Sequence, residues 1–235
     1  ERTGKSLEID NLGMREMQRR AYSARENKYI LIKAPPASGK SRALMFLGLD
    51  KIYNQGLKKV IVSVPERTIG KSFARTELKK FGFFTDWDYD EKYNLCTPGD
   101  EGKISIFKSF LFDENSKILI CTHATLRHSY NQLKAEDFNN ILLAIDEFHH
   151  VSADEANILG KVLNGIMSGS TAHIVAMTGS YFRGDNIPVL MDEDEAQFKK
   201  VTYNYYEQLN GYKYLKSLGI GYHFYQGEYT SAVDE

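Results

Sequence analysis

The chain has 235 residues, of which 42% are hydrophobic and 26% are charged, so its composition suits one large globular domain and excludes a disordered chain. Its 30 Lys and Arg nearly balance its 31 Asp and Glu, and the resulting net charge of -1 gives no bulk attraction to nucleic acid, so any such site must come from local motifs. The two cysteines form no CxxC pair and no apolar run approaches the ~20 residues that span a bilayer, which argues against a zinc ribbon, a disulfide framework and a membrane protein.

Short apolar runs alternate along the chain with longer stretches of helical pattern. Each run is apolar on both faces, as expected for a strand that helices cover on both sides. The runs cover residues 29–32, 60–64, 118–121, 141–145 and 173–177. The helical stretches cover residues 41–53, 65–81 and 153–167. This alternation predicts an α/β fold with a mostly parallel central sheet, helices on both faces, and ligand sites at the carboxyl ends of the strands.

Two segments break this alternation. Residues 82–103 look like an irregular insertion, in which residues 83–89 are aromatic and acidic. The tail after Pro188 is rich in tyrosine, and we expect one final helix and a short strand there, packed on the edge of the domain. Its tyrosines could stack on bases, but structural packing is the simpler explanation. We expect residues 1–235 to form a single domain, with residues 190–235 as its C-terminal edge or as a linker to a further domain.

A phosphate-binding loop is predicted directly after the first apolar run. Residues 34–41 read Ala-Pro-Pro-Ala-Ser-Gly-Lys-Ser, the A/G-x-x-x-x-G-K-S/T pattern with Ala34 in the place of the first glycine. Gly39 lets the backbone turn its N–H groups toward a phosphate, and the helix that follows points its positive end at the anion. Lys40 can reach the β- and γ-phosphates of a nucleotide, and the Ser41 hydroxyl can coordinate Mg²⁺.

An acidic pair, Asp146 and Glu147, follows the apolar run 141–145. Carboxylates at the carboxyl end of a buried strand can hold a hard cation and position water. We expect Asp146 to bind Mg²⁺ and Glu147 to polarise the water that attacks the γ-phosphate. Alone, the pair could be a solvated turn, but the phosphate loop supplies the other half of the same reaction. The adjacent His149 and His150 lack the i, i+4 spacing of a helical zinc pair, so we expect His149 to hydrogen-bond beside the nucleotide instead.

From about Met14 to Ser180, the order of these motifs resembles the first RecA-like domain of superfamily 2 helicases, the DEAD/DEAH-type (DExH) subgroup. The resemblance rests on residues 14–18 as the adenine-reading Q-type motif, 34–41 as motif I, 64–67 as motif Ia, 121–126 as motif Ib, 146–149 as motif II and 177–180 as motif III. Within this family the chain most resembles the restriction-type helicases, which are motor subunits of restriction systems and motors of mobile elements or phages. The resemblance implies the fold of a RecA-like P-loop NTPase.

The resemblance also implies the cofactors ATP and Mg²⁺ and a role for each motif. The residues implied in ATP binding are Arg15, Gln18, Pro36, Ala37, Ser38, Gly39, Lys40, Ser41 and Arg42. Those implied in catalysis are Lys40, Asp146, Glu147 and His149, with Ser41 and Asp146 as ligands of Mg²⁺. Those implied in contacts with the nucleic-acid backbone are Pro65, Arg67, Thr122 and His123, although Thr122 could simply cap a helix. Those implied in coupling hydrolysis to strand movement are Thr178, Gly179 and Ser180.

The chain departs from the family pattern in three places. Met17 stands where an aromatic residue is usual, which makes adenine selectivity by Gln18 less strict. Gly179 takes a position that is alanine in the usual motif III. No Gln-x-x-Gly-Arg-x-x-Arg segment occurs, and in this family that segment of a second RecA-like domain supplies an arginine finger, which is worth about 10³–10⁵ in rate. We therefore expect this chain alone to bind ATP, to hydrolyse it poorly and not to unwind duplex.

The function that the resemblance implies is an ATP-driven helicase or translocase on double- or single-stranded DNA. Its expected partners are a second RecA-like domain and nuclease or methylase subunits, in the cytoplasm and without a membrane. A nucleotide-gated DNA-binding module, or a motor subunit with little strand separation, is the alternative. A scaffold needs no water-activating acid, so Glu147 argues against it. An unrelated P-loop ATPase would not explain Gln18, Pro65 or residues 178–180.

Overall fold

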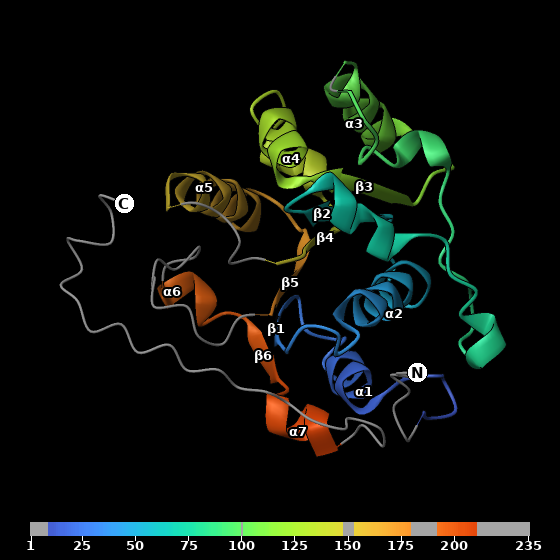
Figure 1. Cartoon of the computed structure of the whole chain (residues 1–235). Coiled ribbons are helices and arrows are strands. Elements are labelled where there is room, and N and C mark those ends of the chain that lie inside the picture. Colours follow the sequence, from blue (N-terminus) through green and yellow to red (C-terminus); the bar gives the residue numbers. More distant parts are fainter. Residues whose placement is uncertain (1–8, 100, 148–152, 180–191, 211–235) are drawn as a thin grey trace, which may run out of the picture.

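The computed structural model describes residues 9–99, 101–147, 153–179 and 192–210. Within these ranges six strands form one sheet, and each neighbouring pair is parallel. The strands are β1 (Tyr29–Lys33), β2 (Lys59–Val64), β3 (Ile118–Thr122), β4 (Ile141–Ile145), β5 (His173–Thr178) and β6 (Lys199–Thr202). Their order across the sheet is β3-β2-β4-β5-β1-β6 (Figure 1). The predicted α/β fold with a mostly parallel sheet is confirmed.

Side chains that alternate along each strand build a separate hydrophobic core on each face of the sheet. On β1, Ile30 and Ile32 belong to one core and Leu31 belongs to the other. The helices that cover the first face are α1 (Glu16–Ser23) and α2 (Lys40–Tyr53). Those that cover the second face are α3 (Lys103–Phe112), α4 (His123–Tyr130) and α5 (Ala153–Gly169) (Figure 1). Because helices cover both faces, the strands β1 to β5 are mainly apolar, as the sequence predicted, whereas the edge strand β6 is largely exposed and polar.

The tail supplies the edge of the sheet next to β1. It contains α6 (Asp192–Glu195), β6 and α7 (Tyr205–Asn210), which agrees with the expected final helix and short strand. Tyr203 is buried, with the Arg20 guanidinium 5.4 Å from its ring centroid, whereas Tyr205 and Tyr206 are exposed. Packing therefore explains Tyr203, while Tyr212 and Tyr214 lie outside the described residues.

The predicted helix over residues 65–81 is wrong. This segment instead forms two 3-10 turns, η1 (Arg67–Phe73) and η2 (Lys79–Phe81), and Thr76 between them makes an antiparallel bridge to Trp87. The fully buried Trp87 donates its indole N–H to the Phe73 carbonyl oxygen over 2.9 Å. Gly70 packs so closely that a Cβ there would lie 2.7 Å from the Cys96 sulfur. These tertiary contacts override the weak helical pattern of the segment.

The insertion is irregular as far as Gly99, apart from the turn η3 (Glu91–Tyr93). Helices α3 and α4 were not assigned from the sequence, and neither was the turn η4 (Ala135–Phe138). Both helices are short, at 10 and 8 residues, so their apolar period repeats only two or three times and gives a weak signal.

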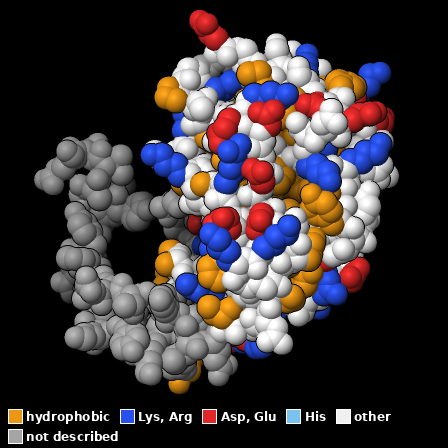
Figure 2. Space-filling view, turned by 90° about the vertical axis from the view of Figure 1, so that its right-hand side faces the viewer, with side chains coloured by type: hydrophobic (Ala, Val, Ile, Leu, Met, Phe, Trp, Pro, Cys, Tyr) orange, Lys and Arg blue, Asp and Glu red, His pale blue; other side chains and the backbone are white. Residues whose placement is uncertain are grey.

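Positive and negative side chains are interspersed over the face of the molecule that Figure 2 shows, with hydrophobic side chains between them. This face therefore carries no large patch of one sign, as the near-zero net charge suggests.

Candidate nucleotide site and nucleic-acid groove

The phosphate loop connects β1 to α2 at the carboxyl edge of the sheet. Ala37 and Gly39 adopt left-handed backbone conformations, with φ values of 61° and 94°, and α2 then begins at Lys40. A Cβ at position 39 would lie 2.5 Å from the Gln18 side-chain nitrogen, so only glycine fits this turn without displacing Gln18. The first turn of α2 points its backbone N–H groups and its positive dipole end into the loop, which suits an anion.

Gln18 joins α1 to this loop. Its buried carboxamide donates to the Gly39 carbonyl oxygen over 3.2 Å and accepts from the Arg15 backbone N–H over 2.8 Å. The structure thus brings Arg15 and Gln18 to the phosphate loop. Gln18 thus holds the loop at Gly39, directly before α2.

Lys40 and Glu147 meet above the loop. The Lys40 side chain is only 7% exposed, and its Nζ lies 3.1 Å from the Ala34 carbonyl oxygen and 3.4 Å from Glu147 Oε1. The other Glu147 oxygen accepts from the Gly179 backbone N–H over 3.1 Å. Lys40, Glu147 and Gly179 belong to three different motifs, and the first and last of them are more than a hundred positions apart in the chain. The fold nevertheless brings the three into direct contact.

Asp146 lies at the end of β4, and only 4% of it is exposed. Its backbone N–H donates to the Ser63 carbonyl oxygen over 2.8 Å, and its Oδ1 accepts from the Glu147 N–H over 2.9 Å. Burial raises the pKa of Asp146 to about 6, with the Glu147 charge acting in the same direction and Lys40 opposing it. A carboxylate so poorly solvated is suited to a divalent cation, which would supply the missing counter-charge.

A cavity of about 500 Å³ brings these groups together. The predicted residues that line it are Pro36, Ala37, Gly39, Lys40, Ser41, Arg42, Asp146 and Glu147. It holds an ammonium, a hydroxyl, two carboxylates and a turn of backbone N–H groups, which is the donor set that a magnesium nucleotide requires. Ser38 in the same loop is buried, and its hydroxyl has no hydrogen-bond partner among the described residues. The residues present therefore fit ATP with Mg²⁺.

Four further residues line this cavity that sequence reasoning missed, and one of them, Met45, lies on α2. Ile69, Ser72 and Thr76 reach it from the segment that was expected to be a helix. Their only sequence signal is that they follow the carboxyl end of β2, where α/β proteins bind ligands.

The predicted coupling residues lie beside the same cavity as far as the structure describes them. Thr178 ends β5, and its carbonyl oxygen accepts from the Ala34 N–H over 3.1 Å. A Cβ at Gly179 would lie 3.0 Å from Lys40 Nζ and 3.2 Å from Glu147 Oε1. Ser180 and His149 lie outside the described residues.

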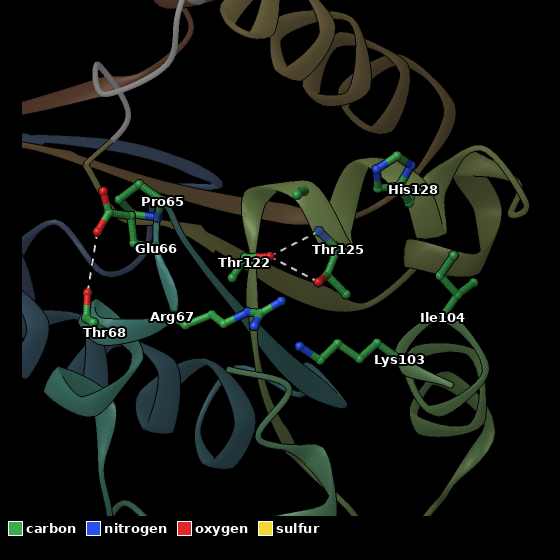
Figure 3. A pocket seen from close by; sticks show the side chains of 10 residues that line it. Pro65, Glu66, Arg67, Thr68, Lys103, Ile104, Thr122, Thr125 and His128 are labelled. Carbon is green, nitrogen blue, oxygen red and sulfur yellow. Dashed lines mark hydrogen bonds between the residues drawn. The ribbon is translucent and has the colours of Figure 1, made fainter. Parts of the chain in front are cut away.

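A second cavity, of about 590 Å³, opens at the carboxyl ends of β2 and β3, and we call it the groove (Figure 3). The predicted residues Pro65, Arg67 and Thr122 line it. Its other lining residues are Glu66, Thr68, Lys103, Ile104, Ala124, Thr125 and His128. The Arg67 and Lys103 side chains extend toward one another from η1 and α3, near Thr122 (Figure 3). Two cations and several hydroxyls of this kind suit a phosphate backbone.

Thr122 and His123 also have structural roles. Thr122 caps α4, because its hydroxyl oxygen accepts from the Thr125 N–H over 3.2 Å, so the capping explanation holds as well. His123 is buried, does not line the groove, and lies with its Nδ1 2.7 Å from the Ser63 hydroxyl. His123 thus ties α4 to β2 beneath the groove. Sequence reasoning missed Lys103, which belongs to the unassigned helix α3.

Among the described residues, the structure contains no helix with the length and apolarity needed to cross a membrane.

A family model described as DEAD/DEAH box helicase matches residues 15–183, which include the cavity, the groove and the acidic pair. A curated protein of Bacillus subtilis (strain 168), named "Putative ATP-dependent helicase YeeB", is 60% identical to the chain over 233 residues. The match covers 99% of this chain and 39% of the relative, so the chain spans well under half of that protein.

Solved helicase structures share the fold at low sequence identity. The Hef helicase domain of Pyrococcus furiosus gives a TM-score of 0.56 at 15% identity, over 88% of this chain and 41% of that one. The UvsW helicase from bacteriophage T4 gives a TM-score of 0.51 at 14% identity, over 80% of this chain and 59% of that one. The helicase MrfA bound to DNA gives a TM-score of 0.52 at 16% identity, over 81% of this chain and 27% of that one. The predicted RecA-like fold is thus confirmed.

Proposed function

Because the chain belongs to the DEAD/DEAH box helicase family, we propose that it is the ATP-binding motor domain of a DNA-dependent ATPase, a helicase or translocase. The observation that carries this proposal is the contact between Lys40, Glu147 and Gly179, since it joins three motifs of one reaction at one cavity. In this proposal a second RecA-like domain completes the site, and the isolated chain turns over slowly because it has no arginine finger.

The predicted site residues divide the chemistry among them in this proposal. The backbone N–H groups of the loop and Lys40 bind the phosphates, while Ser41 and Asp146 hold Mg²⁺. Mg²⁺, when bound, would neutralise the charge that develops on the transferring phosphoryl group. Glu147 contacts the Lys40 ammonium through one carboxylate oxygen, so its carboxylate lies where it can orient the attacking water. Gln18 and Arg15 support the base end of the nucleotide, and His149 adds a hydrogen bond beside it.

The contact between Gly179 and Glu147 supports the coupling role of residues 178–180. The Gly179 N–H binds the carboxylate proposed to orient water, so loss of the γ-phosphate would alter this hydrogen bond directly. Thr178 is also bonded to the phosphate loop through Ala34. A change at the nucleotide would therefore reach β5 through two hydrogen bonds.

The groove supports a role in backbone binding for Pro65, Arg67 and Thr122. The Arg67 guanidinium and the Thr122 hydroxyl can bind phosphates without reading sequence, which suits a motor that moves along DNA. His123 would act beneath the groove by holding α4. We further propose that the complete protein works in the cytoplasm and that nuclease or methylase subunits of a restriction system are its partners.

The test is ATP hydrolysis by the protein that carries this domain together with its second RecA-like domain. We expect DNA to raise the rate, Glu147→Gln to lower kcat by about 10²-fold or more, and Arg67→Ala to weaken stimulation by DNA. A rate that DNA leaves unchanged would contradict the motor and would favour a nucleotide-gated binding module. Lys80→Ala, on an exposed turn away from both cavities, is the control and should behave as wild type.

A further inference from the structure

A third cavity, of about 470 Å³, lies in the insertion beside the groove, and we call it the side cavity. Apolar surface from Leu95, Pro98 and Ile106 forms part of its wall. Two acidic residues also line it, Glu101 and Glu91, and the Glu91 carboxylate lies 3.7 Å from the Arg75 guanidinium. None of the motifs from the sequence includes these residues.

Lys103 connects the side cavity to the groove, because it lines both. The lysine is 7% exposed, and its Nζ donates to the Thr97 carbonyl oxygen over 2.8 Å. This hydrogen bond fixes the side chain where it forms part of the wall of both cavities. On the groove side its side chain extends toward Arg67 (Figure 3). The two cavities therefore adjoin at Lys103.

The two cavities differ in the chemistry that they can bind. In the groove, Arg67 and Lys103 outnumber the one lining acid, Glu66, and the hydroxyl-bearing Thr122 and Thr125 also line it, which suits phosphates. The charged lining residues of the side cavity are two acids, Glu91 and Glu101, and two bases, Lys92 and Lys103. Lys92 is also paired with Asp90 and Asp113, and Glu91 with Arg75, so a phosphate gains no net attraction there. Apolar walls cover the faces of an uncharged ring, and carboxylates accept hydrogen bonds from exocyclic amines such as the N4 amine of cytosine. The side cavity is therefore suited to a nucleobase.

We propose that the side cavity accepts an unstacked base of a single strand whose phosphates lie in the groove. The inference rests on the proposed function, because it assumes that the groove holds a nucleic-acid backbone. A base inside a duplex is stacked and paired and cannot enter the side cavity, so the site favours single-stranded DNA over duplex at this position. It also favours bases that carry an exocyclic amine.

The experiment compares two probes on the whole chain by fluorescence anisotropy: a short oligodeoxycytidylate and an oligomer of equal length made only of abasic deoxyribose phosphates. The two carry the same phosphates, so the ratio of their Kd values isolates the bases. We expect wild type to prefer the oligodeoxycytidylate by about fivefold or more, the lower end of what one stacked base contributes. Ile106→Ala should reduce this preference at least about twofold, because it removes one wall of the side cavity.

Ile104→Ala is the matched control, since Ile104 lies two residues earlier on α3 and lines only the groove. It should change both Kd values alike and leave their ratio as in wild type. Should Ile106→Ala fail to fold, Glu101→Gln on the exposed rim gives the same comparison.

The outcomes separate the two proposals. If both probes bind, weaken with salt and with Arg67→Ala, but show a ratio that the side-cavity variants leave unchanged, the base site is wrong and the groove stands. If wild type binds neither probe, the nucleic-acid function fails and the base site fails with it.

Discussion

Gly39 and Gly179 lie on either side of Lys40 and differ in what a methyl group would meet. At position 39 the backbone is left-handed and the Gln18 side chain is 2.5 Å from the Cβ position. At position 179 the nearest atoms, 3.0–3.3 Å away, are the flexible ends of Lys40 and Glu147. The first position therefore requires glycine, and the second only prefers it.

We predict that Gly179→Ala lowers the free energy of unfolding by less than about 1 kcal/mol, because the two side-chain ends can move by a few tenths of an ångström. Gly39→Ala should cost about 1–3 kcal/mol, since the new side chain is strained and also displaces Gln18. Urea unfolding of both variants checks this pair of values. An equal cost at the two positions would contradict the geometry of the loop.

His173 should make stability depend on pH. Burial lowers its pKa from 6.5 to about 4, with the charges of Lys51 and Lys28 acting in the same direction. The folded state thus holds a neutral imidazole that the unfolded state protonates below about pH 6.5. The stabilisation is complete above pH 6.5 and is lost as the pH falls toward 4.

We predict that the free energy of unfolding falls by about 1 kcal/mol between pH 6.5 and 5, a value reduced for the partial exposure of the ring. His173→Gln should remove this part of the slope, because glutamine does not titrate. Denaturant unfolding at several pH values measures both curves. Parallel curves for variant and wild type would rule out His173 as the source.

At the scale of the elements, the apolar strands could be predicted from the sequence, but the conformation of residues 65–81, which follow β2, could not. A strand buried on both faces is an unbroken apolar run, such as Ile141–Ile145, and needs no tertiary information to be recognised. The phosphate loop and the acidic pair that line the nucleotide cavity were also predictable, because each follows the end of such a strand. Residues 65–81 depend instead on Trp87, which is distant enough in the chain that no local pattern reveals the contact. The same cause hid Ile69, Ser72 and Thr76 from the predicted site.

We predict that Trp87→Phe lowers the free energy of unfolding by about 1–3 kcal/mol, because the Phe73 carbonyl oxygen loses its buried donor. Since Trp87 holds the segment that carries Ile69 and Ser72, nucleotide affinity should fall as well, by a few-fold. Calorimetric titration and urea unfolding measure the two effects. Phe84→Leu, a change on an exposed ring, is the control and should alter both values little. Unchanged nucleotide affinity in Trp87→Phe would show that the segment does not shape the cavity.

For the whole molecule, one sheet with two cores brings distant motifs to one edge. The nucleotide cavity lies at the carboxyl ends of β1, β4 and β5, and the groove lies at those of β2 and β3. Because β2 and β4 are neighbours in the sheet, the two cavities lie next to each other. Ser63 on β2 makes this proximity concrete: its carbonyl oxygen binds Asp146 and its hydroxyl binds His123. Ser63 therefore contacts both Asp146 of the nucleotide cavity and His123 beneath the groove. The chain spans 39% of its Bacillus relative.

The most direct measurement is a calorimetric titration of the chain with ATP in the presence and absence of Mg²⁺. We predict saturable binding at one site, strengthened by Mg²⁺, and a loss of at least about tenfold in affinity in both Lys40→Ala and Asp146→Asn, with Lys80→Ala unchanged. Absence of heat on adding ATP to folded wild-type chain, or wild-type affinity in both cavity variants, would contradict the assignment of this cavity to ATP.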